Sequence, residues 1–70
     1  MHHSFVSFPD AFEEDPDRLG VRFATKVGYF WVARNQEELV QLLRQSIQSG
    51  AELEVTYDPA TLEIRDLLRR

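Results

Sequence analysis

The sequence contains no cysteine, which excludes disulfide bonds and every metal site built on thiolates. No apolar run approaches the roughly 20 residues that a membrane-spanning helix needs. The N-terminus also lacks the basic and apolar regions of a signal peptide. We therefore expect a soluble cytoplasmic protein, and we expect no cofactor.

Basic residues are scarce as well: 8 Lys and Arg stand against 12 Asp and Glu, which gives a formal net charge of -4. An acidic chain repels phosphate backbones at long range, so nucleic acid is not the expected partner. The 70 residues form one domain, and a domain of this size buries only about 60% of the surface that its unfolded chain exposes. This thin stability margin favours self-association.

An amphipathic helix over residues 35–50 is the clearest local element. Asn35 is suited to the N-cap position, and Glu38 stands three residues later, where it can complete a capping box. Gly50 stands where a left-handed residue can end the helix. At about 100° per residue the large apolar side chains share one side of the helix: Leu39, Val40, Leu42, Leu43 and Ile47.

Alternating apolar and polar residues predict two β-hairpins, one on each side of this helix. The predicted strands are residues 19–25, 28–33, 51–57 and 62–67. Gly28 serves the first turn, and Asp58 with Pro59 serves the second. A short second turn pairs apolar with apolar and acid with base across the hairpin: Tyr57 with Leu62, Val55 with Ile64, and Glu54 with Arg65.

The sequence therefore predicts an α+β fold, a four-stranded sheet of two hairpins joined by the helix in the order β-β-α-β-β. The helix packs on one face of that sheet. Residues 18–70 form this single domain, and residues 1–17 precede it as an extended arm and an acidic connector. In the connector, Pro9 begins a single helical turn that Pro16 ends.

An aromatic surface lies on the sheet face that the single helix cannot cover. Three interpretations of it stay open: the arm folds over it, a second copy or another protein binds it, or bases stack on it. In the third interpretation Arg22, Lys26 and Arg34 would hold phosphates. The predicted partner-binding residues are Tyr29, Trp31, Arg22, Phe5 and Phe8.

The connector carries an acidic surface of Asp10, Glu13, Glu14, Asp15 and Asp17. Its spacing is not that of a calcium loop, so a solvated surface is the favoured interpretation. At the N-terminus, Met1, His2 and His3 could chelate Cu(II) or Ni(II) through the α-amine, two amide nitrogens and an imidazole. A flexible end is the ordinary alternative, and we predict no metal site.

Residues for catalysis are few, because both histidines stand within the first three positions and the three glycines are isolated. Neither a nucleophile beside its base nor a phosphate-binding loop can be recognised. We therefore expect no enzyme but a small noncatalytic protein-protein interaction module, homodimeric, that binds through its aromatic and charged sheet face or an edge strand. The alternative is an acidic inhibitor or nucleic-acid mimic that docks on a basic groove of a partner protein.

Overall fold

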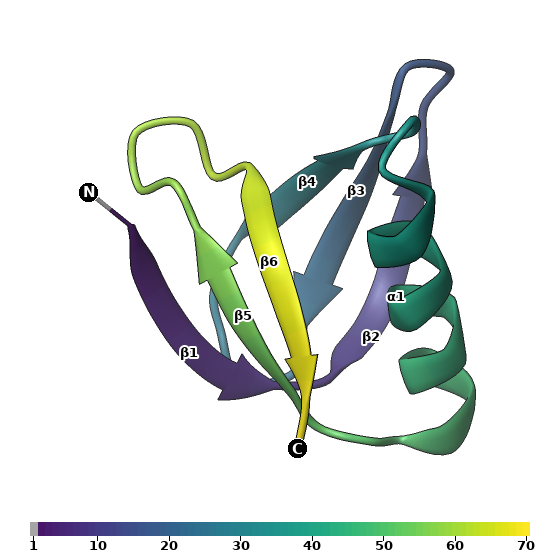
Figure 1. The fold of residues 1–70 in the computed structure, drawn as a ribbon, viewed down its shortest axis with the longest axis vertical. Helices are drawn as coiled ribbons and strands as arrows, with labels where there is room; N and C mark the ends of the chain where they lie inside the picture. Colours follow the sequence, from purple (N-terminus) through teal and green to yellow (C-terminus); the bar gives the residue numbers. More distant parts are fainter. Residues whose placement is uncertain (1) are drawn as a thin grey trace.

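The computed structural model describes residues 2–70, and within them the chain forms six strands and one helix (Figure 1). The elements in chain order are β1 (His3–Ser7), β2 (Pro9–Glu14), β3 (Arg18–Phe23), β4 (Tyr29–Ala33), α1 (Glu37–Ser49), β5 (Leu53–Tyr57) and β6 (Ile64–Arg69). The helix is too short and too polar to cross a membrane.

The strands of residues 2–70 form two antiparallel three-stranded sheets, in the orders β1-β5-β6 and β2-β3-β4. β1 and β2 follow each other in the chain but belong to different sheets, so the N-terminal segment links the two. α1 lies alongside β2 and β6 (Figure 1). The fold is α+β, but the predicted four-stranded sheet with a helix on one face is wrong.

The error lies in His3–Ser7 and Pro9–Glu14, which form strands of the two sheets where an extended arm and an acidic connector were predicted. Phe12 pairs with Val21, and its ring packs against the core, while Glu13 pairs with Gly20 on the opposite face. This pairing supplies backbone hydrogen bonds that an isolated helical turn would lack. Pro9 has no N–H and occupies the first strand position, next to a break in the register, where a proline is tolerated.

The second hairpin forms between β5 and β6, but the predicted register is wrong. Tyr57 pairs with Ile64 and Val55 with Leu67, with an irregularity between Thr56 and Tyr57. The turn is longer than predicted because Leu62 takes a positive φ of 66° and its N–H donates to the Asp58 carbonyl oxygen at 2.7 Å. Leu62 therefore belongs to the turn and not to a strand.

The first hairpin forms with its faces directed as predicted, but its turn is longer, because β3 ends at Phe23 and β4 begins at Tyr29. Val21 of β3 pairs with Phe30 of β4, which directs Tyr29 and Trp31 to the outer face. Gly28 has a φ of 94°, as its position in the turn requires. The inward side chains of this hairpin meet those of the other sheet in the buried core: Leu19, Val21, Phe23, Phe30, Val32, Leu43, Leu53, Val55, Tyr57, Ile64 and Leu67.

The helix closes one side of this core. Its predicted apolar face is confirmed at the centre by Leu43, which is 0% exposed, and Gly50 ends the helix with a left-handed φ of 73°. The predicted Asn35 cap is wrong, because Gln36 occupies the N-cap without a side-chain hydrogen bond. Ser46 is also buried, and its hydroxyl donates to the Ala51 carbonyl oxygen.

Candidate functional site

A hollow of about 240 Å³ lies on the outer face of the β2-β3-β4 sheet. Its centre is a row across the sheet in which Gly20 of β3 stands between Glu13 of β2 and Trp31 of β4. We call this hollow the Gly20 groove. Around Gly20 it is lined by Glu13, Asp15, Arg18, Tyr29, Trp31, Thr61 and Leu62, together with Phe30.

Gly20 forms the floor of the groove because it has no side chain. A Cβ atom added there would lie 3.2 Å from the Glu13 Cβ and 3.8 Å from Cδ1 of Tyr29. Glycine weakens a strand interior and often marks a close approach of another chain or ligand. Gly20 is itself buried, so Glu13 and Tyr29 close over it and the acidic and aromatic walls of the groove meet there.

Trp31 forms the aromatic wall together with Tyr29, and it is sheltered in a way that the sequence did not suggest. Its indole Nε1–H donates to the Thr61 carbonyl oxygen at 2.9 Å, and its backbone N–H donates to the Leu62 carbonyl oxygen at 3.1 Å. The Arg18 guanidinium lies 5.2 Å from the ring centroid. The β5–β6 turn and Arg18 therefore cover part of the half-buried indole, a cover that the sequence interpretations did not include.

The structure brings together some of the predicted partner-binding residues and separates others. Tyr29, 47% exposed, lies beside Trp31 and opposite Arg22 on the outer face, where the Arg22 Nε donates to Asp10 Oδ1 at 3.3 Å. Phe5 instead faces the core, with its ring centroid 5.2 Å from that of Phe23 and 5.3 Å from that of Phe30. Phe8 is half-buried between β1 and β2.

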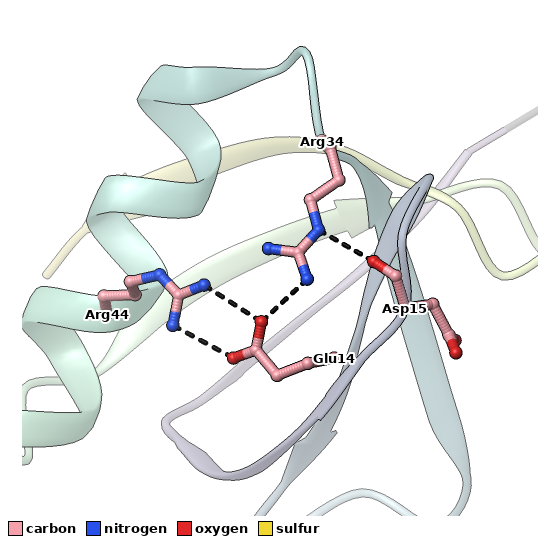
Figure 2. A network of polar contacts seen from close by, with 4 residues as sticks. All are labelled: Glu14, Asp15, Arg34 and Arg44. Atoms are coloured by element: carbon pink, nitrogen blue, oxygen red, sulfur yellow. Dashed lines mark hydrogen bonds and ion pairs between the residues drawn. The ribbon is translucent and has the colours of Figure 1, made fainter.

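The acidic residues divide into paired and unpaired groups. Glu14 accepts hydrogen bonds from Arg44 of α1 at 3.1 and 3.2 Å and from Arg34 Nη2 at 2.7 Å, and the Arg34 Nε donates to the Asp15 carbonyl oxygen at 2.9 Å (Figure 2). The hydrogen bonds from Arg44 and then Arg34 lower the pKa of the Glu14 carboxyl. This network ties β2 to the helix and to the segment after β4.

Glu13 and Asp15 form no ion pair among residues 2–70, and both line the Gly20 groove. Asp10 pairs with Arg22, and Asp17 is exposed away from the groove lining. The acidic surface is therefore not one continuous patch, because its members face different neighbours.

The three basic side chains that the base-stacking interpretation assigned to phosphates have other neighbours in the structure. Arg22 pairs with Asp10, Arg34 binds Glu14, and the Lys26 Nζ lies 5.3 Å from the centroid of the Phe5 ring at the edge of the core. None of these three side chains lines the Gly20 groove. The copper or nickel chelate considered for the N-terminus, but not predicted, includes Met1, which lies outside the described residues.

Sequence reasoning missed the contribution of Gly20, Arg18 and the turn residues Thr61 and Leu62. A glycine inside an alternating strand was the available signal for a close approach at this point. The turn residues could not be found in this way, because their position depends on how the two sheets meet.

Comparison with known proteins shows the fold alone. No known protein family matches this chain, and no curated protein matches its sequence. Two solved structures share its fold, each with a TM-score of 0.86: a pro- protein-glutaminase at 17% identity and a mutant of that protein at 16%. They match 99% and 100% of this chain, which spans only 26% of each of those chains.

These structures contradict our expectation that the chain is not an enzyme, because the protein that shares the fold is named a protein-glutaminase, which is an enzyme. That expectation used the scarcity of nucleophiles and bases in 70 residues. The argument fails where the same fold occupies 26% of a longer chain, since the remainder of such a chain can supply those groups.

Proposed function

We propose that this chain is a protein-binding domain and that the Gly20 groove is its docking surface. The observation that carries the proposal is an aromatic wall of Tyr29 and Trp31 beside a floor without a side chain. Tyr, Trp and Arg are the residue types that contribute most binding energy at protein interfaces, and the groove has all three through Arg18.

The fold comparison supports a partner of considerable size. In pro- protein-glutaminase this fold is one part of a longer chain, of which it spans 26%. The counterpart of the remaining part, for this chain, is a separate protein or further residues of its own polypeptide.

The alternative of an acidic nucleic-acid mimic has less support. A mimic needs a regular array of free carboxylates, but Glu14 is bound by Arg34 and Arg44, and Asp10 is paired with Arg22. These arginines neutralise two positions of the predicted acidic surface.

Site-specific photocrosslinking tests the proposal. A photoreactive phenylalanine analogue at Tyr29 is expected to capture a polypeptide from an extract of the native source. The same analogue at Leu68, which is 56% exposed on β6 of the other sheet, is the control and is expected to capture much less of that polypeptide. Equal capture at both positions, or none at position 29, would refute a docking role for the groove.

Self-association and a cytoplasmic location are also part of the proposal. Sedimentation at high micromolar concentration is expected to show a dimer, and a monomer there would remove the second copy from the candidate partners. Cell fractionation tests the location, and recovery of the chain outside the cytoplasm would contradict it.

A further inference from the structure

We infer that the Gly20 groove accepts a lysine or arginine side chain from an extended segment of a partner polypeptide. This inference rests on the proposed docking function and specifies the chemistry of the partner. Three properties of the groove support it: its unpaired carboxylates, its aromatic wall and its size.

The carboxylates of Glu13 and Asp15 are the first argument. Within residues 2–70 neither forms an ion pair, and of the carboxylates without one, which also include Asp17, Glu37, Glu38, Glu52 and Asp66, only these two line the groove. Figure 2 shows the Asp15 carboxylate directed away from Arg34, so only the backbone of Asp15 takes part in that network. Two carboxylates against the single guanidinium of Arg18 leave the groove with a negative charge.

The aromatic wall is the second argument. The face of an indole or phenol attracts a cation within about 6 Å of its centroid. The chain already makes one such contact, between Arg18 and Trp31 at 5.2 Å. Tyr29 is 47% exposed and has no cation over its ring among residues 2–70, so a partner cation can lie over the exposed part of the Tyr29 ring, next to Glu13.

The size of the groove is the third argument. Its volume of about 240 Å³ is below the roughly 300 Å³ at which pockets for drug-sized molecules begin. A single side chain fits this space better than a cofactor does. Gly20 itself is buried, with the Glu13 Cβ and the Tyr29 ring close above it, so a partner side chain would lie over these two residues.

An anionic occupant fits the groove less well. A carboxylate or phosphate could contact Arg18, but it would face Glu13 and Asp15 at the same time. Like charges at this range oppose binding. A nucleic acid would meet the same repulsion.

The sole tryptophan of the chain, Trp31, reports directly on this groove. We would titrate the protein with capped alanine pentapeptides that carry lysine, glutamate or leucine at the centre, and with single-stranded poly(U) RNA. The indole N–H resonance of Trp31 and the amide resonance of Gly20 measure binding by NMR. The lysine peptide is expected to bind at least about 5-fold more tightly than the leucine peptide, and the glutamate peptide more weakly than either.

Two charge-matched variants separate groove binding from the effect of net charge. Glu13→Gln is expected to lower the affinity for the lysine peptide by about 2- to 5-fold. Glu52→Gln removes the same charge from an exposed residue outside the groove lining and is expected to change the affinity by much less. Unchanged helix and sheet content by circular dichroism would show that both variants fold.

Each other outcome overturns the inference. Equal affinity for the three peptides, no shift with any peptide at the highest soluble concentration, or tighter binding of RNA would each contradict a basic side chain as the occupant. Equal loss in Glu13→Gln and Glu52→Gln would reduce the effect to net charge. A capture at Tyr29 that persists in any of these cases would keep the docking function while rejecting its charge preference.

Discussion

Replacement of Leu43 by alanine tests whether the α1 helix closes the core as the structure shows. Leu43 is 0% exposed and lies on the helix, which packs beside β2 and β6. Truncation of a fully buried leucine costs about 2 to 5 kcal/mol, since the lost transfer energy adds to the cavity left behind. A 70-residue domain has a total stability of about 4 to 10 kcal/mol at the usual stability per residue.

Leu43→Ala is therefore expected to remove a fifth or more of the free energy of unfolding. Urea denaturation followed by Trp31 fluorescence measures it, because the Trp31 indole is hydrogen-bonded to the β5–β6 turn and reports the contact between the two sheets. Leu68→Ala is the control, since Leu68 is 56% exposed and should cost less than about 0.5 kcal/mol. A loss below about 1 kcal/mol in Leu43→Ala would refute the assigned helix face.

Three further predictions concern single sites. Gly28→Ala should lower the free energy of unfolding by about 1 to 2 kcal/mol, measured by urea denaturation. The cost comes entirely from the backbone, because φ is 94° and an added Cβ meets nothing within 4 Å. An unchanged stability would contradict the left-handed turn. Arg44 and Arg34 lower the pKa of Glu14 in the folded state. The ionised Glu14 carboxylate therefore stabilises the fold fully above the ordinary carboxyl pKa, and this stabilisation is lost as the pH falls through the lowered pKa of the folded state. Glu14→Gln should therefore flatten the acid limb of the stability curve, and an identical limb would refute the network. Ser46→Ala should destabilise by about 1 kcal/mol, because it removes the buried hydroxyl that donates to Ala51, and an unchanged melting temperature would show that this bond adds nothing.

The parts of the fold that depend on local chemistry could be predicted from the sequence. The apolar spacing around Leu43 and the left-handed glycines at positions 28 and 50 are both confirmed. The outward direction of Tyr29 and Trp31 follows from strand alternation and is also confirmed. Each of these features is determined within a few neighbouring residues.

The parts that depend on distant pairing could not be predicted. Pro9 to Glu14 form a strand because β3 is available as a partner, which an acidic segment with one large apolar residue does not reveal. Leu62 leaves its predicted strand because the turn extends far enough for its carbonyl oxygen to accept from Trp31. That contact places the β5–β6 turn over the Trp31 indole. The aromatic residues of the candidate site could therefore be predicted, but the residues that surround them could not.

The affinity of the Gly20→Ala variant for the protein captured at Tyr29 tests the central proposal most directly. The added methyl group would lie 3.2 Å from the Glu13 Cβ, so Glu13 must shift by a few tenths of an ångström, although the strand position has no positive φ. We expect a folded domain whose affinity for that protein falls by about 5- to 30-fold, as for a residue at the centre of an interface. An affinity equal to that of the unaltered chain would contradict docking in the groove.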